Sequence, residues 1–328
     1  MARPDREGEV IGVNEKAYMD INLLHGDCLI ESDNIESGSV DLILTDLPYG
    51  TMNGFNGIDW DFAIDPKKVY DIANRVLRKN GKMVLFSQEP YTGQLTTQAI
   101  PNVPFNYRMI WQKDNFANAL LCNKAPVSYF EDVLVFSKHP ESERNDDNPI
   151  KLYADKVFDY VNVSTRELKN KYGKDFLSHF KAAGKQFRLC TRQSYDLLIE
   201  DYNLKKMKGF VEWEVLKKMD GDYKEKFHSI FNLPEGKKYK SNILKYKKDY
   251  TGLHPTQKPI LLLEDLIKTF SNEGDLVVDL TMGSGSTAVA CINTNRNFIG
   301  IELDDKYFEI AKRRISEAQN KPEQITMG

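Results

Sequence analysis

Apolar positions recur along the first part of the chain with two different periods. Residues 21–24 and 40–45 are short apolar runs rich in β-branched side chains, and they predict buried strands. Residues 66–81 carry apolar side chains at helical spacing, with Pro near the start and Gly at the end, and they predict a helix. Further strands are predicted at residues 82–87, 106–113 and 131–138, and a further helix at 92–100.

The same alternation returns in the last part of the sequence. The pattern predicts an amphipathic helix at 260–271, a strand at 276–280, a turn into a helix at 283–294, a strand at 297–303 and a helix at 304–318. Strands that alternate with helices imply a parallel sheet covered on both faces. We therefore expect a Rossmann-like, mostly parallel α/β sheet that is begun before residue 140 and completed after residue 250.

The segment between these two halves has a different character. A polar, turn-rich stretch at residues 142–149 leads into Lys-rich helical stretches with interleaved aromatic side chains. We expect most of these rings to form the core of a small inserted helical domain: Tyr172, Phe176, Phe180, Phe187, Tyr195, Tyr202, Phe210 and Trp213. The predicted organisation is an N-terminal extension (1–20), a first sheet half (21–140), the insert (141–250), a second sheet half (251–319) and a C-terminal tail (320–328).

Charge is unevenly distributed over the 328 residues. The formal net charge is −3, but residues 141–250 contain 24 Lys and Arg against 18 Asp and Glu, whereas the rest contains 21 against 30. A basic middle between acidic flanks indicates contact with nucleic acid, with the lysines of 204–210 and 235–248 as phosphate contacts. A solvated, Lys-rich surface explains the composition equally well.

Several other classes of protein are disfavoured. The first ten residues lack the basic start and apolar stretch of a signal peptide, and no apolar run reaches the roughly 18 residues that span a bilayer. The four cysteines lie far apart, and together with the five histidines they suggest neither a metal site nor a disulfide framework. We therefore expect a cytoplasmic protein without a membrane partner or a bound metal.

A glycine turn follows the predicted strand at 276–280. Gly283 and Gly285 allow a tight turn and a close approach of the backbone to a ligand, and the helix that follows begins with free N–H groups. Glu302 ends the next strand, where a carboxylate can bind both ribose hydroxyls. The strand, the glycine turn, the helix and the terminal acid together predict a nucleoside-cofactor site.

Asp279 discriminates between nucleoside cofactors. The spacing of Gly283, Gly285 and Ala288 is compatible with a dinucleotide such as NAD. A carboxylate at residue 279 would repel a pyrophosphate seated on the helix N-terminus, but it suits a cationic ligand. S-Adenosylmethionine has an ammonium, a sulfonium and no phosphate, and it therefore fits better.

A second constellation, Asp46-Leu47-Pro48-Tyr49, follows the predicted strand at 40–45. Pro48 biases Leu47 toward an extended conformation, so the Asp46 carboxylate and the Leu47 carbonyl become two acceptors for one NH2 group. Tyr49 supplies a ring on which a planar base can stack. Two such acceptors stabilise the positive charge that develops when an exocyclic amine attacks a methyl group. A strand end with an Asx-type turn and a surface Tyr is the alternative interpretation.

These motifs resemble those of β-class amino-group DNA methyltransferases. Residues 46–49 resemble the Asp-Pro-Pro-Tyr signature, residues 279–287 resemble the Asp-Pro-Phe-x-Gly-Ser-Gly-Thr cofactor loop, and residues 254–259 look like the His-Pro-x-Gln-Lys-Pro segment at the methionine end of the cofactor. The resemblance covers roughly residues 21–140 and 251–319. It implies a seven-stranded methyltransferase sheet in circularly permuted motif order, with an insert that recognises the target.

The resemblance also assigns roles to individual residues. The residues expected to be catalytic are Asp46, Leu47, Pro48 and Tyr49. Those expected to bind the cofactor are Asp27, Thr256, Lys258, Asp279, Thr281, Gly283, Ser284, Gly285, Ser286, Thr287 and Glu302, with Asp27 near the adenine. Residues 81–88 and 131–138 are expected to complete the wall of the base pocket.

The chain departs from the family pattern at two places. Leu47 replaces the first Pro of the signature, and Leu280-Thr281-Met282 replaces Pro-Phe-x in the cofactor loop. Because the expected contact at residue 47 is a backbone carbonyl, a Leu there affects the rate more than the reaction. The missing ring at residue 281 affects the packing of the adenosine.

The reaction implied is methyl transfer from S-adenosylmethionine to adenine N6 of a base flipped out of double-stranded DNA. Adenine is favoured over cytosine because the signature begins with Asp, whereas cytosine-N4 members more often begin with Ser. Residues 50–62 predict a loop that closes over the base, although Phe55 and Trp60 also fit as core anchors. The alternatives are a cytosine-N4 methyltransferase, a catalytically weak DNA-binding regulator, a nicotinamide-dependent oxidoreductase, and methylation of RNA or protein. A homodimer and a cognate restriction endonuclease are partners that the resemblance leaves open.

Overall fold

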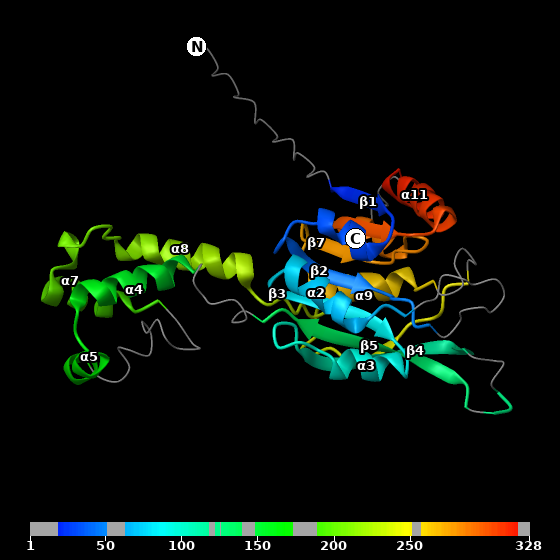
Figure 1. The fold of residues 1–328 in the computed structure, drawn as a ribbon, viewed down its shortest axis with the longest axis horizontal. Helices are drawn as coiled ribbons and strands as arrows, with labels where there is room; N and C mark the ends of the chain where they lie inside the picture. Colours follow the sequence, from blue (N-terminus) through cyan, green and yellow to red (C-terminus); the bar gives the residue numbers. More distant parts are fainter. Residues whose placement is uncertain are drawn as a thin grey trace, which may run out of the picture.

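The centre of the molecule is a sheet of eight strands, flanked by a separate helical unit (Figure 1). The computed structural model describes residues 19–50, 63–117, 122–124, 126–139, 148–172, 189–250 and 257–320. The strands are β1 (Ile21–His25), β2 (Val40–Thr45), β3 (Leu77–Ser87), β4 (Phe105–Ala117), β5 (Ser128–Ser137), β6 (Ile243–Lys245), β7 (Leu276–Asp279) and β8 (Asn297–Glu302). They lie in the order β1-β8-β7-β2-β3-β5-β4-β6. Among these described strands only β5 pairs antiparallel, with β3 and β4, so the predicted mostly parallel α/β sheet is confirmed.

The sheet has one strand more than the seven that the resemblance implies. The additional strand, β6, pairs in parallel with β4, and its three residues lie inside the range 141–250 that was assigned to the insert. Only Leu244 of this strand is buried, between two exposed residues. The two apolar residues of this strand, Ile243 and Leu244, are too short a pattern to indicate a strand from sequence.

The predicted helix over residues 66–81 is shorter in the structure. Helix α2 spans Pro66–Val76, and β3 begins at Leu77, which is fully buried. Arg78 forms an ion pair with Asp41 on β2, which ties this segment to the sheet. Tertiary pairing therefore overrides the helical periodicity at the end of the predicted helix.

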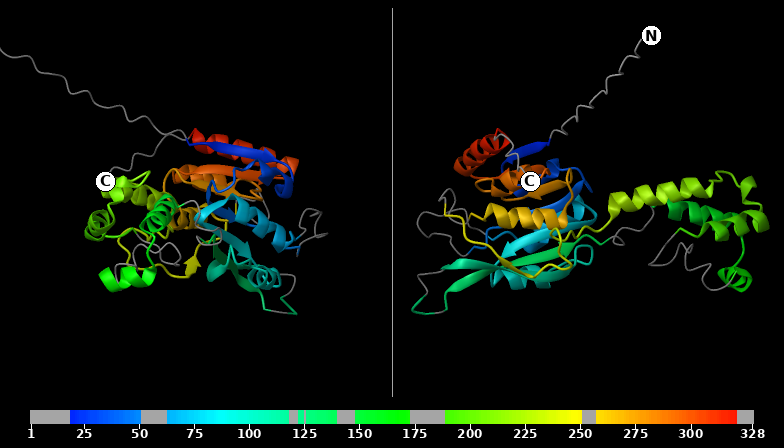
Figure 2. Two further views of the ribbon diagram at one scale, coloured as in Figure 1. Left: turned by 60° about the vertical axis from the view of Figure 1, so that its left-hand side comes forward. Right: turned by 180° about the vertical axis from the view of Figure 1, so that it is seen from behind.

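Two hydrophobic cores fill the two faces of the sheet. Along β2, Leu42 and Leu44 belong to one core and Ile43 to the other, as the alternation of side chains along a strand requires. The first core packs the sheet against α9 (Ile260–Phe270), α10 (Ser286–Asn293) and α11 (Asp305–Gln319). The second packs it against α1 (Cys28–Glu31), α2 and α3 (Tyr91–Thr97). Helices therefore cover both faces of the sheet, as Figure 2 shows.

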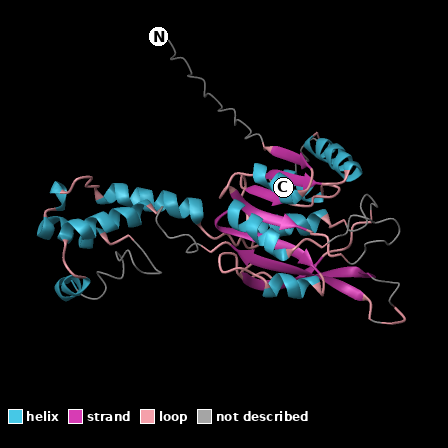
Figure 3. Cartoon of the chain, in the orientation of Figure 1, coloured by secondary structure: helices cyan, strands magenta, loops and turns pink. Residues whose placement is uncertain are grey.

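The helical unit contains α4 (Pro149–Val161), α5 (Thr165–Tyr172), α7 (Arg192–Tyr202), the 3-10 turn η3 (Leu204–Lys206) and α8 (Trp213–Phe227). It has its own core and lies to one side of the strands (Figure 3). Within it Tyr195 is buried, and four further rings pack there: Tyr172, Tyr202, Phe210 and Trp213. The prediction that the insert's rings form a core is confirmed for these residues, and Phe176, Phe180 and Phe187 lie outside the described residues. Asn148 caps α4 and Pro149 is its first residue, so the helix begins within the last two residues of the predicted turn-rich stretch 142–149.

Strands β2 and β7 are neighbours at the point where the direction of the chain across the sheet reverses. From β2 the chain continues through α2 on one face to β3, and from β7 it continues through α10 on the other face to β8. Helices that leave on opposite faces open a crevice at the carboxyl ends of the two strands, where α/β sheets bind ligands. No helix in the described part of the chain is long and apolar enough to cross a membrane.

Candidate functional site

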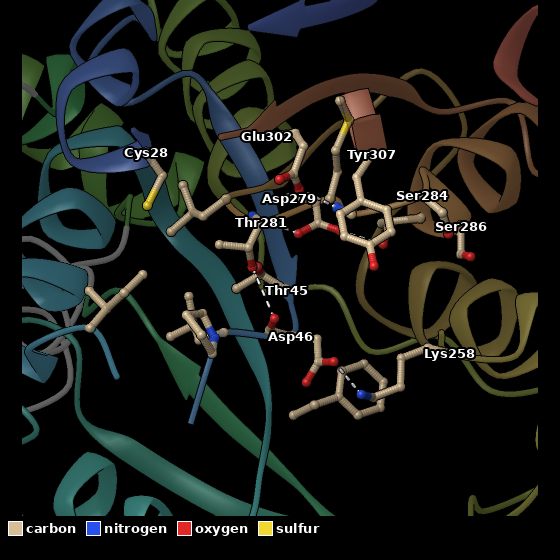
Figure 4. Close-up of a pocket in the computed structure, with 18 of the residues that line it drawn as sticks. Cys28, Thr45, Asp46, Lys258, Asp279, Thr281, Ser284, Ser286, Glu302 and Tyr307 are labelled. Atoms are coloured by element: carbon tan, nitrogen blue, oxygen red, sulfur yellow. Dashed lines mark hydrogen bonds and ion pairs between the residues drawn. The ribbon is translucent and has the colours of Figure 1, made fainter. Parts of the chain in front are cut away.

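A cavity of about 1200 Å³ lies in this crevice, at the ends of β2, β7 and β8 (Figure 4). Among the predicted site residues, those that line it are Asp27, Asp46, Leu47, Pro48, Tyr49, Lys258, Asp279, Thr281, Gly283, Ser284, Ser286, Thr287 and Glu302. Gly285 caps the start of α10 beside them. Thr256 and residues 51–62 of the predicted closing loop lie outside the described residues. Both predicted constellations therefore face one space.

Asp279 is the last residue of β7 and is 3% exposed. Its two carboxylate oxygens accept hydrogen bonds from the Thr287 hydroxyl at 2.6 Å and from the Thr281 N–H at 3.1 Å. Burial raises the pKa of Asp279 to about 6 despite these bonds. One carboxylate thus ties the strand end, the glycine turn and the first turn of α10 together.

The glycine turn needs backbone conformations that other residues rarely adopt. Gly283 has φ +53° and Gly285 has φ +80°, both in the left-handed region. A Cβ at residue 285 would lie 3.0 Å from the Cβ of Ala311 on α11, closer than side chains normally pack. The absence of a side chain at this position therefore permits both the turn and the close approach of α11.

Arg314 on α11 supports the turn from outside and was not predicted as a site residue. Its guanidinium donates to the Ser284 carbonyl at 2.6 Å and to the Ser286 hydroxyl at 3.1 Å. The Ser284 hydroxyl also donates to the Gln257 side-chain carbonyl at 3.2 Å. Both predicted serines therefore have structural partners within the protein. Arg314 lies 30 residues after Ser284, and no sequence motif links the two positions, so the sequence could not indicate this contact.

Glu302 ends β8 as predicted, and two backbone groups fix its carboxylate. One oxygen accepts from the Gly283 N–H and the other from the Asp304 N–H, each at 2.8 Å. Burial raises the pKa of Glu302 above its ordinary value. Each carboxylate oxygen has two lone pairs, so the backbone bonds orient the group and still leave acceptor capacity for a ligand.

Asp27 lies two residues after the end of β1 and lines the cavity. Its side chain accepts from the Leu29 N–H at 2.9 Å and caps the short helix α1. The cap holds the carboxylate at the cavity wall, and the N–H of the preceding residue, Gly26, donates to the Glu302 carbonyl at 2.9 Å.

Asp46 follows β2 directly, and its side chain is 21% exposed. One carboxylate oxygen is ion-paired with Lys258, and the other accepts from the Tyr49 hydroxyl at 2.5 Å. Its backbone carbonyl accepts from the Thr281 hydroxyl at 3.0 Å (Figure 4). Thr281 belongs to the glycine turn, so a direct hydrogen bond joins the two predicted constellations.

Three predicted residues have contacts that the sequence did not indicate. The Tyr49 hydroxyl donates a hydrogen bond to the Asp46 carboxylate, and the centroid of the Tyr49 ring lies 6.1 Å from that of Tyr91. Leu47 is 2% exposed and packs in the core against α2 and α3, which explains how an apolar residue other than Pro is accommodated there. Lys258, which we expected at the cofactor, pairs with the Asp46 carboxylate.

Two further charged residues, Lys113 on β4 and Glu131 on β5, extend this cluster. Lys113 was not predicted, and Glu131 was expected only as part of the pocket wall at residues 131–138, where it does line the cavity. Their side chains form an ion pair of 2.5 Å, and the Lys258 ammonium lies 3.3 Å from the second oxygen of Glu131. Side chains two residues apart on a strand lie on the same face of the sheet. Glu131 therefore shares a face with the buried Val133, and Lys113 with the buried Trp111, which could have indicated that both point inward. The pairing of β4 with β5 that brings them together is not readable from either segment alone.

Burial and charge act in opposite directions on this cluster. Burial opposes ionisation of Glu131, but Lys258 and Lys113 hold the pKa of its carboxyl below the ordinary value. Burial likewise opposes the charge on Lys258, but Asp46 and Glu131 outweigh it and raise its pKa. Lys258 is therefore an ammonium at neutral pH, held by two carboxylates.

The lining of the cavity is predominantly acidic. The acidic residues are Asp27, Asp46, Asp65, Glu131, Asp249, Asp279, Glu302, Asp304 and Asp305, and the basic ones are Lys68, Lys113, Lys248 and Lys258. Such a site suits a ligand with positive charge and hydroxyl groups better than a phosphate-rich one. Across the described residues no group of three or more His, Cys, Asp or Glu is placed to hold a metal ion.

The family model described as DNA methylase, N6_N4_Mtase, matches residues 40–313, a range that contains both constellations. The chain belongs to this family. It is therefore a DNA methyltransferase of the group that modifies adenine N6 or cytosine N4, and membership does not decide between the two bases.

Individual relatives of this methylase match over most of its length. The DNA adenine methyltransferase YhdJ of Escherichia coli (strain K12) is 24% identical over 308 residues, 91% of this chain and 83% of that protein. The orphan methyltransferase M.BamHII of Bacillus amyloliquefaciens is 28% identical over 292 residues, 86% of this chain and 91% of that protein. The crystal structure of the M1.HpyAVI–SAM complex has a TM-score of 0.49 and 22% identity, and covers 90% of this chain and 99% of that one.

Proposed function

We propose that this methylase transfers a methyl group from S-adenosylmethionine to the N6 amino group of an adenine flipped out of double-stranded DNA. The observation that carries the proposal is the hydrogen bond from the Thr281 hydroxyl to the Asp46 carbonyl. It joins a nucleoside-type half site, built on Asp279 and Glu302, to an amine-accepting half site built on Asp46. Donor and acceptor of a methyl group must meet at such a junction for direct transfer.

The residues around the glycine turn fit S-adenosylmethionine. Glu302 offers oriented acceptors for ribose hydroxyls, and Asp279 and the acidic lining suit the ammonium and sulfonium. When bound, the cofactor supplies an electrophilic methyl group on a cationic sulfur. The chain contributes the carboxylates that bind it and the turn that lets the backbone approach it.

The Asp46 side of the cavity fits an exocyclic amine. The Asp46 carboxylate and the Leu47 carbonyl would accept the two amino hydrogens, which directs the nitrogen lone pair toward the methyl group and stabilises the developing positive charge. Phe86, Trp111 and Tyr49 also line this side and supply flat apolar surface for a base. A paired, stacked base could not reach these groups, so the target has to leave the duplex.

Two observations favour adenine over cytosine. The signature begins with Asp46, and YhdJ, which matches 91% of the chain, is described as an adenine methyltransferase. Digestion of methylated DNA to nucleosides and mass spectrometry would separate the two products. Recovery of N4-methylcytosine in place of N6-methyladenine would replace our proposal by the cytosine alternative.

We further propose that residues 141–250 recognise the target DNA, with the sheet halves 21–140 and 251–319 forming the catalytic body. The helical unit has a core of its own and exposed lysines at residues 205, 206 and 208. One lysine in the predicted phosphate-binding segment 235–248 does not fit this role, because Lys240 is 6% exposed and paired with Asp265 at 2.5 Å.

The decisive experiment is transfer of an isotopically labelled methyl group to duplex DNA by the wild-type protein and by Asp46→Ala. We expect the variant to lose at least 1000-fold in turnover, since it lacks the acceptor carboxylate. Wild-type turnover by the variant would refute the role of Asp46. DNA binding without any methyl transfer by the wild type would favour a regulator with the same fold.

A further inference from the structure

Three buried side chains and one partly buried side chain form a row of alternating charge in the cavity: Lys113, Glu131 and Lys258, followed by Asp46. The side chains of Lys113, Glu131 and Lys258 are 3%, 9% and 7% exposed. Lys258 lies between two carboxylates, ion-paired with Asp46 on one side and 3.3 Å from a Glu131 oxygen on the other. The ammonium therefore has two carboxylates within reach, and only one of them belongs to the predicted signature.

The Glu131 oxygen that faces Lys258 is unusual. It is buried, and within the described residues it has no hydrogen-bond partner, while the other oxygen of the same carboxylate is bonded to Lys113 at 2.5 Å. Leaving a buried acceptor without a donor costs about 1–3 kcal/mol, more for a charged group. This oxygen is ion-paired with the Lys258 ammonium at 3.3 Å without forming a hydrogen bond to it, so it can still accept one from the lysine.

The Asp46 carboxylate is in the opposite situation. Lys258 occupies one of its oxygens and the Tyr49 hydroxyl the other. A target amino group must compete with both donors, and the cationic Lys258 is the stronger competitor because charge-assisted hydrogen bonds are about twice as strong as neutral ones. An ammonium on Asp46 also offsets the negative charge that stabilises the developing cation on nitrogen.

We propose that Glu131 is a positioning residue that takes Lys258 away from Asp46 when the target base enters. This inference rests on the role of Asp46 proposed above. The Lys258 ammonium shifts to the unsatisfied Glu131 oxygen, and the Asp46 oxygen becomes free for the amino group. Lys113 pairs with the other oxygen of Glu131 and competes with Lys258 for the charge of this carboxylate. The exchange needs a short movement of one side chain, that of Lys258. The lysine stays paired with a carboxylate throughout.

The test compares three variants by turnover, by KM for DNA and by affinity for S-adenosylhomocysteine. In Glu131→Gln the lysine loses one of the two carboxylates that pair with it among the described residues, and Asp46 remains, so we expect kcat to fall 10- to 100-fold with little change in cofactor affinity. In Lys113→Met the Glu131 carboxylate is fully available to Lys258, so we expect kcat to be retained or raised. The opposite signs of these two effects distinguish an exchange from a general need for buried charges.

The matched control is Asp265→Asn, which breaks the Lys240–Asp265 pair, a buried lysine ion pair of 2.5 Å outside the cavity. Thermal unfolding of all variants measures the structural cost, and we expect the control to lose stability and to keep kcat. If Glu131→Gln does not fold, Lys113→Met alone decides, since a loss of kcat as large as that of Asp46→Ala contradicts the exchange. Wild-type kcat in folded Glu131→Gln, with Asp46→Ala inactive, would overturn this inference and leave the proposed function standing.

Discussion

At the scale of single residues, the two half sites are joined by side chains that differ from the family pattern. Thr281 stands where the pattern has Phe, and its hydroxyl binds the Asp46 carbonyl at 3.0 Å. The loss of the ring was expected only to affect adenosine packing. The structure shows that the residue gained a second contact, which fixes the backbone that carries Asp46.

Thr281→Val removes this contact together with the 3.0 Å hydrogen bond between the Thr281 and Thr45 hydroxyls, both at the end of β2. Val has the shape of Thr without the hydroxyl, and a neutral hydrogen bond contributes about 1 kcal/mol, so we expect kcat to fall about 3- to 10-fold. Affinity for S-adenosylmethionine should change less than twofold, because no acid that lines the cavity is removed. Steady-state kinetics and calorimetry measure the two effects. An equal loss in both quantities would argue against a specific role in holding Asp46.

Asp279 predicts the direction of a pH dependence. Its pKa is raised to about 6 by burial, so the carboxylate is charged above this pH and neutral below it. Attraction for a cationic ligand is therefore present above pH 6 and lost as the pH falls through 6. One pH unit below the pKa leaves about a tenth of the sites charged, so we expect the affinity for S-adenosylmethionine at pH 5 to be about tenfold below that at pH 8.

Asp279→Asn provides the control for that titration. Its affinity should be low and nearly constant between pH 5 and pH 8, because the titrating group is gone. A wild-type profile that is equally flat would contradict the role of Asp279. Because burial raises the pKa of Asp279 to about 6, wild-type stability should fall as the pH rises from about 4 to 6, and the Asn variant should lack this dependence.

At the scale of elements, the glycine turn depends on its packing against α11. Gly285→Ala introduces a Cβ 3.0 Å from that of Ala311 and places Ala at φ +80°, a conformation that costs a non-glycine residue about 1–3 kcal/mol. We expect a loss of stability of at least that size and a loss of cofactor binding. Gly274→Ala is the matched control, since Gly274 has φ +82° and open space around it. Urea unfolding measures the loss of stability in both variants, and the difference between them is the cost of the contact with α11. Equal losses would show that this contact has no effect on stability.

Elements were predictable from sequence where local pattern and tertiary pairing agree. The strand at residues 40–45 has its predicted bounds, because its apolar run is buried on both faces. Residues 77–81 were predicted as the end of a helix but form the start of β3, because this strand pairs with β2 and the helical periodicity cannot reveal that pairing.

The site shows the same division. The acids that follow β2, β7 and β8 were predictable because parallel strands end at one edge of the sheet. Lys113, Arg314 and the ion pair of Glu131 with Lys113 were not, because they depend on the register of β4 with β5 and on the approach of α11 to the glycine turn.

At the scale of the whole molecule, the helical unit and the catalytic body should contribute separately to binding DNA. Exposed Lys205, Lys206 and Lys208 lie on the helical unit. If each contacts a phosphate, replacing all three by Gln should lower the salt dependence of DNA affinity by about 2–3 in the log–log slope. Cofactor affinity should not change. Lys312→Gln on α11 is the control, and an equal effect of the control would show that the loss reflects net charge alone.

The pairing of β1 with β8 ties the first described strand to the last. On a ribosome, β1 emerges roughly 270 residues before its partner, a delay on the order of 10–60 s at usual rates of synthesis. β7, which separates β8 from β2 in the sheet, is also made late. During that interval the nascent chain holds the half that would accept the base but not the half that would hold the cofactor. The order of synthesis therefore keeps the growing polypeptide inactive until both halves of the sheet have been made.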